Sequence, residues 1–149
     1  MIQIRLSNEY DTAKIVEFQV AMALETEDFE LSVDTVNKGV TAVFNDSSKG
    51  KYFVATDDNE IVGSLLLTPE WSDWRNMWVM WIQSVYVVPN KRGSGVFRVL
   101  YDHIVEYVGN NNEVAGLRLY VDLSNHKAIE VYKKIGMIGD HYQLFEVMK

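Results

Sequence analysis

An apolar run, a glycine-rich loop and the start of an amphipathic helix follow one another in VMWIQSVYVVPNKRGSGVF, residues 79–97. The run over Val79–Val88 is rich in β-forming residues and has no charge, which predicts a central strand buried on both faces. After Pro89 and the glycines, apolar residues recur at helical spacing. This stripe consists of Val96, Leu100, Ile104 and Val108. The order strand, loop, helix makes the loop the first candidate for a functional site.

Hydrophobic periodicity on either side predicts the other elements. Towards the N-terminus it indicates a strand at 2–6, helices at 9–25 and 33–44, and a hairpin of strands 51–56 and 61–68. Towards the C-terminus it indicates a strand at 117–121, a helix at 125–135 that Gly136 ends, and a closing strand at 141–148. This mixture predicts an α/β (α+β) fold, with a mixed sheet and helices on its faces.

The composition limits the class of protein. The 149 residues predict one domain over residues 1–149, and no apolar run approaches the ~18 residues of a membrane span, so we expect no membrane partner. The net charge of −7 argues against a nucleic-acid partner, which needs a basic surface. The absence of cysteine excludes disulfides, a thiolate metal site and a cysteine nucleophile. We therefore expect no metal and a cytoplasmic location.

The net negative charge of the chain comes entirely from its first part. Residues 1–60 hold 5 basic and 12 acidic residues, whereas residues 61–149 hold 9 of each. The densest acidic segment is Glu25-Thr26-Glu27-Asp28-Phe29-Glu30. This segment is either the solvated end of a helix or an acidic wall that attracts a cationic substrate. Under the second interpretation, Glu25 is a candidate substrate-binding residue.

The loop Arg92-Gly93-Ser94-Gly95 has the features of an anion-binding site. Glycines let the backbone turn sharply and aim N–H groups at one point, the following helix adds the positive end of its dipole, and Arg92 adds a full charge. The alternative is a tight turn before a helix. A Walker A loop does not fit, because Val96 and Phe97 stand where that motif requires lysine and serine or threonine. A dinucleotide-binding loop does not fit either, because Asp122 comes 27 residues after Gly95 and too few residues follow it.

Two blocks resemble the GNAT superfamily of N-acetyltransferases. Arg92-Gly93-Ser94-Gly95-Val96-Phe97 is similar to that family's acetyl-CoA loop, Gln/Arg-x-x-Gly-x-Gly/Ala, with Phe97 in place of the usual small third residue. Leu119-Tyr120-Val121, followed by Asn125, Ala128, Tyr132, Gly136 and Met137, is similar to its strand–helix block. The element order is also similar over nearly the whole chain. The resemblance implies a mostly antiparallel sheet with a splayed central strand pair, and acetyl-CoA as the acyl donor.

The resemblance also implies roles for single residues. The backbone at the end of the central strand would pair with the pantetheine arm, and the N–H groups from Gly93 to Phe97 would receive the pyrophosphate. Asn125 would touch the arm near the thioester. The implied cofactor-binding residues are Val85, Tyr86, Val87, Arg92, Gly93, Ser94, Gly95, Val96, Phe97 and Asn125.

Tyr132 is the implied catalytic residue, close to the sulfur as general acid. Direct transfer needs a neutral amine to attack the thioester, and a tyrosine with a pKa of ~10 is a competent proton donor to the departing thiolate. A backbone N–H near Val85 or Val87 would stabilise the oxyanion. The alternative for Tyr132 is a tyrosine at the edge of the core. The general base stays open among Glu25, Glu27, Asp73 and Asp122, whereas the amide of Gln83 cannot act as a base.

All four tryptophans lie within eleven residues, at Trp71, Trp74, Trp78 and Trp81. One interpretation is a hairpin arm that packs on the domain or makes a homodimer contact. The other is an acceptor pocket, in which Trp74 faces a cationic group and Asp73 pairs with an ammonium. Arg75 would instead favour a carboxylate on the acceptor, so an acceptor with both groups, such as an amino acid or peptide, is compatible.

We therefore expect an acetyl-CoA-dependent N-acetyltransferase that acts directly on a primary amine of a small molecule or peptide. Two alternatives remain: a non-catalytic acyl-CoA-binding module on the same fold, and transfer of a longer acyl chain on the same scaffold. Tyr132 favours the enzyme, whereas the lack of an evident base favours the binding module.

Overall fold

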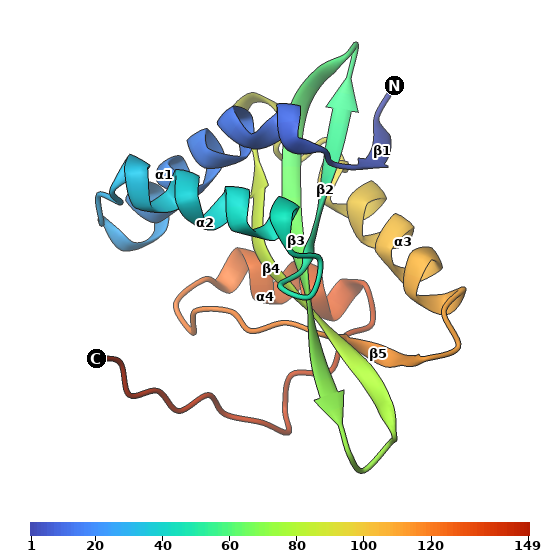
Figure 1. The fold of residues 1–149 in the computed structure, drawn as a ribbon. Coiled ribbons are helices and arrows are strands. Elements are labelled where there is room, and N and C mark those ends of the chain that lie inside the picture. The colour runs from blue at the N-terminus through green and yellow to red at the C-terminus, as the bar shows by residue number, and fades with distance from the viewer. The chain divides into compact units, whose positions relative to one another are not determined.

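Five strands form one sheet in the order β1-β2-β3-β4-β5 in the computed structural model, which describes residues 1–149 (Figure 1). The strands are β1 (Gln3–Leu6), β2 (Lys51–Asp57), β3 (Glu60–Ser72), β4 (Met77–Val87) and β5 (Val114–Arg118). Neighbouring strands are antiparallel, except that β4 and β5 are parallel. The expected mixed, mostly antiparallel sheet is therefore confirmed.

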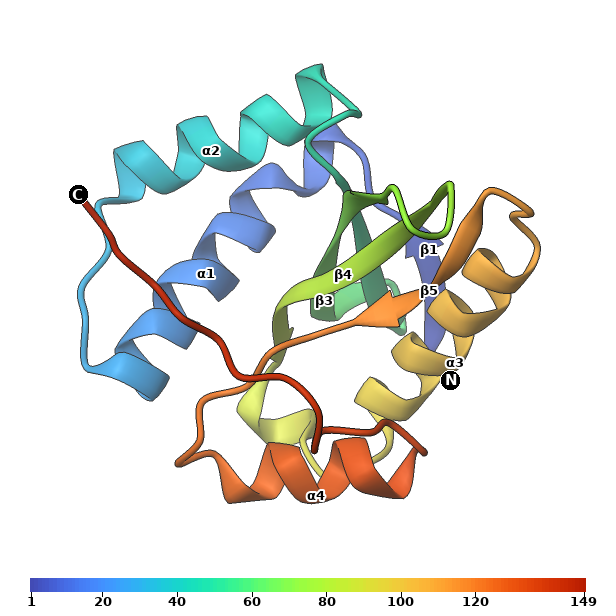
Figure 2. The ribbon, with the colours of Figure 1, turned by 90° about the horizontal axis from the view of Figure 1, so that it is seen from below.

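The chain falls into two units, Met1–Arg118 and Leu119–Lys149, and the sheet belongs to the first. That unit also contains the helices α1 (Thr12–Glu27), α2 (Val33–Asn45) and α3 (Val96–Gly109), and the short 3-10 helices η1 (Glu9–Asp11) and η2 (Pro89–Lys91). Helices α1 and α2 cover one face of the sheet and α3 covers the other (Figure 2). None of the helices combines the length and the apolar character that crossing a membrane requires.

Alternating side chains of β2 serve the two faces. Tyr52 and Val54 pack against residues of α1 and α2, whereas the Phe53 ring contacts Tyr107 and His103 of α3. All three β2 side chains are buried. Burying an apolar side chain of this size contributes about 1.5–3 kcal/mol, so the alternation explains why helices cover both faces. The contact with Phe53 also shows that His103 packs against the sheet.

The entry into α1 is set by short polar contacts. Asn8 accepts a hydrogen bond from the Tyr10 N–H at 3.0 Å, and Asp11 accepts one from the Asn8 N–H at 2.9 Å, which is a reciprocal capping box. Both carboxylate oxygens of Asp11 also accept from Arg5 on β1, at 2.7 and 2.9 Å. The Arg5 guanidinium lowers the pKa of Asp11 below its ordinary value. These contacts fix the helix start beside the first strand.

Strands β4 and β5 pair over a short stretch only. The ladder runs from Trp78 opposite Val114 to Trp81 opposite Arg118, where β5 ends. The rest of β4, from Ile82 to Val87, pairs with β3 alone. The expected splay of the central strand pair thus follows from the register.

The central strand is less buried than the sequence predicts. Only Val79, Ile82 and Tyr86 of β4 are buried. The expectation of burial on both faces was wrong, because β5 flanks only the first part of the strand and the hairpin end projects beyond α2 and α3 (Figure 1).

Two further expectations at the C-terminal side need correction. The strand expected at 117–121 begins earlier and ends at Arg118, and residues 119–121 are not in a strand. The strand expected at 141–148 is not formed. A favourable pattern makes a strand only when a neighbouring backbone accepts its hydrogen bonds, and these residues take part in no ladder.

The second unit contains one helix, α4 (His126–Lys134), and its two ends agree with the prediction. The Asn125 side chain caps the start by accepting from the Ala128 N–H at 3.2 Å. At the other end Gly136 has φ 90°, and the Met137 N–H donates to the Tyr132 carbonyl at 3.0 Å. This is the Schellman arrangement that glycine favours after a helix.

Candidate functional site

The loop between β4 and α3 turns on two glycines. Gly93 has φ 76° and Gly95 has φ 90°, in the left-handed region that residues with a side chain rarely adopt. A Cβ atom at either position would meet no heavy atom within 4 Å. The glycines are therefore required by the backbone turn and not by crowding, and the space beside the loop is open.

Backbone donors at this turn have no protein acceptor. Gly95 is the N-cap residue of α3 and no side chain caps the helix. The N–H groups of Gly93, Ser94 and Gly95 make no hydrogen bond within the protein, while the Ser94 hydroxyl donates to the Lys91 carbonyl at 2.6 Å. The α3 dipole adds partial positive charge at the same place. The geometry is suited to an anion such as a phosphate.

Arg92 ties the loop to α1 and to the end of β4. Its Nε donates to the Val87 carbonyl at 2.8 Å, and its Nη2 donates to Glu25 Oε2 at 2.7 Å. The guanidinium lies over the Tyr86 ring, 5.3 Å from the centroid, and the Tyr86 hydroxyl donates to Glu25 Oε1 at 3.1 Å. Burial and the nearby Glu25 carboxylate raise the pKa of Tyr86. The structure thus joins four residues that the sequence singled out separately, and Glu25 is bound to the loop.

A second ion-pair cluster lies at the start of the same loop. Lys91 Nζ donates to Asp57 Oδ2 at 2.8 Å, and the N-terminal ammonium donates to Asp57 Oδ1 at 2.9 Å. These two cations lower the pKa of Asp57, and Asp57 in turn raises the pKa of Lys91. The Lys91 ammonium is therefore bound to the end of β2.

The end of β4 that precedes the loop contains a bulge. The register passes from Leu66 opposite Gln83 to Ser64 opposite Tyr86, so Ser84 and Val85 stand together opposite Leu65. Ser84 has φ 52°, a strained value for a serine within a strand. The bulge turns the backbone of Val85 out of the regular ladder. Val96 and Phe97, the last predicted residues of the loop, begin α3, where Val96 is buried.

Asn125 and Tyr132 belong to the second unit. The Asn125 side chain is the cap of α4 described above, with its carbonyl oxygen bound to the Ala128 N–H. Tyr132 is partly buried, and burial raises the pKa of its hydroxyl above the ordinary value of 10. A raised pKa keeps this phenol protonated through neutral pH.

The candidate bases differ in how strongly they are already bound. Asp122 accepts hydrogen bonds from the Ser124 hydroxyl and N–H, which lower its pKa and make it a weaker base. Glu25 is held by Arg92, whereas Glu27 is exposed at the end of α1.

Glu70 is not among the residues that the sequence pattern singled out. Its carboxylate accepts from Trp81 Nε1 and pairs with Arg118 at 3.2 Å, so one acidic side chain of β3 bridges β4 and β5. Gln83 donates to the Thr68 hydroxyl at 2.7 Å on the same face. The signal that could have found this cluster is the spacing of Thr68 and Glu70, two residues apart in a strand.

The hairpin between β3 and β4 lies at the other end of β4 from the glycine loop. Eleven residues of strand separate the two ends, a span of roughly 35 Å. At the hairpin, Trp71 and Trp78 are cross-strand partners with ring centroids 5.0 Å apart. Trp74 is 91% exposed, and Asp73 accepts a hydrogen bond from its N–H at 2.9 Å. Asp73 and Trp74 are therefore not brought together with Glu25 or the loop.

Comparison with known proteins gives one family and many structures. The model of the acetyltransferase (GNAT) family matches residues 16–137. A possible acetyltransferase from Clostridium difficile 630 is 38% identical, with a TM-score of 0.92, over 100% of this chain and 98% of its own. No curated protein matches the chain.

Two more distant structures share the fold. A predicted acetyltransferase with acetyl-CoA from Clostridium acetobutylicum is 18% identical, with a TM-score of 0.78, over 99% of this chain and 96% of its own. A ribosomal-protein-alanine N-acetyltransferase from Brucella melitensis is 14% identical, with the same TM-score of 0.78, over 99% of this chain and 100% of its own.

Proposed function

The chain belongs to the GNAT family of acetyltransferases, and on that premise we propose that it transfers an acetyl group from acetyl-CoA directly to a primary amine of a small molecule or peptide. Acyl transfer in general follows from the family. The observation that carries the finer proposal is the open glycine turn at the end of a β4 edge that β5 leaves unpaired.

The residues at this turn fit the donor's diphosphate. The N–H groups of Gly93, Ser94 and Gly95 would hold it, because they have no other acceptor and lie at the positive end of α3. The backbone from Val85 to Val87 would pair with the pantetheine arm along the edge beyond the last β5 contact. When bound, acetyl-CoA supplies an activated acyl carbonyl and a thiolate leaving group.

Two groups of the chain would act on the reacting atoms, and a third would orient the arm. A backbone N–H at the Ser84–Val85 bulge would donate to the acyl oxygen as negative charge develops there. The Tyr132 hydroxyl would give its proton to the departing sulfur, since its raised pKa keeps that proton in place. Asn125 caps α4 with its side-chain oxygen, so its amide N–H₂ group would be the part that orients the pantetheine arm.

We also propose that both units act as one domain in the cytoplasm. The family model spans residues 16–137 and so crosses the boundary between Arg118 and Leu119. The absence of cysteine suits a reducing compartment.

The test is thiol release from acetyl-CoA in the presence of a panel of primary amines. We expect turnover with at least one amine, and Tyr132→Phe should lower kcat by ~10²-fold or more without changing the affinity for acetyl-CoA. Tyr10→Phe is the matched control, because Tyr10 is 89% exposed. Equal rates for Tyr132→Phe and wild type at every pH would remove Tyr132 from catalysis. Binding of acetyl-CoA without consumption of any amine would favour a non-catalytic binding module.

A further inference from the structure

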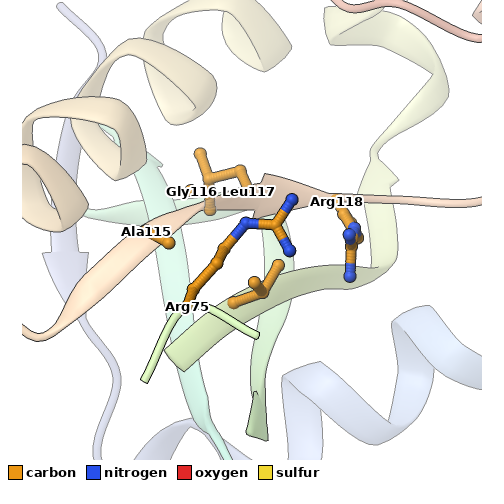
Figure 3. A pocket seen from close by; sticks show the side chains of 6 residues that line it. Arg75, Ala115, Gly116, Leu117 and Arg118 are labelled. Atoms are coloured by element: carbon orange, nitrogen blue, oxygen red, sulfur yellow. The ribbon is translucent and has the colours of Figure 1, made fainter. Parts of the chain in front are cut away.

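We propose that the pocket between the hairpin loop and β5 binds a carboxylate of the acceptor, so that the acceptor is an amine that also carries a carboxylate, as an amino acid or the C-terminal residue of a peptide does. The inference rests on the proposed acetyl transfer to an amine. The pocket is lined by Arg75, Val79, Ala115, Gly116, Leu117 and Arg118 (Figure 3).

Arg75 is the one arginine of the chain without an acidic partner. The other four pair with carboxylates: Arg5 with Asp11, Arg92 with Glu25, Arg98 with Asp102 and Arg118 with Glu70. The Arg75 guanidinium has one hydrogen bond, from Nη1 to the Ser72 hydroxyl at 3.3 Å. It therefore keeps most of its donors and its full charge for another group, and a carboxylate is the partner that its planar fork fits best.

A second guanidinium lines the same pocket. The side chain of Arg75 extends from the hairpin loop across β5 toward Arg118 (Figure 3). Arg118 pairs with Glu70 of β3, which also accepts from Trp81, so its position is fixed by neighbouring strands. Because Glu70 balances the charge of Arg118, the uncompensated positive charge of the pocket is that of Arg75, and this charge favours an anion over a neutral or cationic group.

The pocket has the size of a subsite. Its volume is about 160 Å³, whereas pockets that hold a whole small ligand measure ~300–1,000 Å³. Ala115 and Gly116 leave it open because neither carries a long side chain, and a Cβ at Gly116 would meet no heavy atom within 4 Å. Such a site accommodates one functional group of a larger molecule.

The pocket also extends along the paired part of β4 and β5 to the last pair of their ladder. Val79 faces Gly116 in the ladder, and Trp81 faces Arg118 in its last pair. Beyond this pair, the β4 edge is the proposed track of the acyl donor. An acceptor whose carboxylate is held in this pocket would present its amine to the end of that track, which is the spatial requirement of direct transfer.

The experiment compares each α-amino acid of a panel with its own carboxamide. For wild type we expect kcat/KM to be at least ~10-fold higher for the acid, and Arg75→Ala should lower the value for the acid ~10- to 100-fold, the usual effect of losing a hydrogen bond to a charged group. In Arg75→Ala, kcat/KM for the carboxamide and the affinity for acetyl-CoA should be the same as in wild type. Gly116→Val, which fills the pocket, should reproduce the loss. Arg98→Ala is the control, since Arg98 lies on α3 and pairs with Asp102.

A second readout does not depend on turnover. Titration of the acetyl-CoA-free protein with amino acids should shift the backbone N–H resonance of Gly116 in wild type and not in Arg75→Ala, and the carboxamides should not shift it. The protein could acetylate the acid and the carboxamide equally well and show no Gly116 shift. This result would overturn the proposed carboxylate site while leaving the proposed function intact. An Arg75-dependent shift in a protein that acetylates no amine would support the carboxylate site and contradict the proposed function.

Discussion

An arginine flanks β4 at each end, and the two side chains differ in their hydrogen-bond partners. At the loop end, Arg92 is bound by Glu25, the Val87 carbonyl and the Tyr86 ring. At the hairpin end, Arg75 has only the Ser72 hydroxyl. In the proposed function the first arginine holds a loop whose main-chain N–H groups would bind an anion, whereas the second would bind the acceptor's carboxylate itself. An anion site can therefore be built from backbone with a structural arginine, or from an arginine itself.

The loop end depends on backbone geometry, and Gly95→Asp should break it. Aspartate strains a position with φ 90° and places negative charge at the N–H groups that would hold the diphosphate. We expect acetyl-CoA affinity to fall by ~100-fold or more, measured by calorimetry on the folded variant. Gly95→Asn puts a side chain of the same size at this φ without the negative charge, so it should lose less affinity than Gly95→Asp. Equal losses for both variants would show that geometry alone is responsible.

A structural arginine should also matter for stability, and the Arg5–Asp11 pair is the clearest example. The Asp11 side chain is 7% exposed and accepts from Arg5 and the Asn8 N–H. Asp11→Asn should lower the free energy of unfolding by about 1–3 kcal/mol at pH 7, measured by urea denaturation. Arg75→Ala should change it by less than about 0.5 kcal/mol. A larger effect of Arg75→Ala would mean that Arg75 is structural too.

The same pair predicts a pH dependence. The pKa of Asp11 is lower in the folded than in the unfolded chain, so its stabilisation is present above about pH 4 and disappears as the pH falls through the lowered value. Wild type should lose more stability than Asp11→Asn between pH 5 and pH 2 in the same denaturation series. Parallel curves would assign acid sensitivity to other carboxylates.

Glu25→Gln tests the link between the loop and α1 with a smaller expected effect. The ion pair with Arg92 is 38–45% exposed, so the unfolding free energy should fall by less than about 1 kcal/mol. Acetyl-CoA affinity should fall ~3- to 10-fold if Arg92 orders the loop. Glu17→Gln, which disturbs an exposed pair with Lys14 on the same helix, is the control and should leave affinity unchanged.

At the hairpin end we expect an effect on stability alone and none on acetyl-CoA affinity. Trp71→Leu removes the edge-to-face contact with Trp78 and should lower the unfolding free energy by about 0.5–1.5 kcal/mol. Trp74→Leu should be neutral within about 0.5 kcal/mol, because Trp74 is 91% exposed. A cost for Trp74→Leu that grows with protein concentration would indicate a homodimer contact at this hairpin.

Local features could be read from the sequence because they depend on neighbours within a few residues. The stripe Val96 to Val108 predicted α3 and its buried face, and the glycines predicted the turn that now has two positive φ values. Gly136 predicted the end of α4. Periodicity, caps and glycine turns act through the backbone of one segment, so their signals survive without knowledge of the fold.

Pairings between distant segments could not be read in this way. Nothing in the spacing indicated that Glu25 of α1 would bind Arg92, that Glu70 would bridge to Arg118, or that the β4 bulge would fall at Ser84. The same limit explains the strand wrongly expected at 141–148, whose alternation is favourable but which has no ladder partner. A strand edge, an ion pair and a shared pocket each require a partner that folding brings from elsewhere in the chain, and a single segment does not specify that partner.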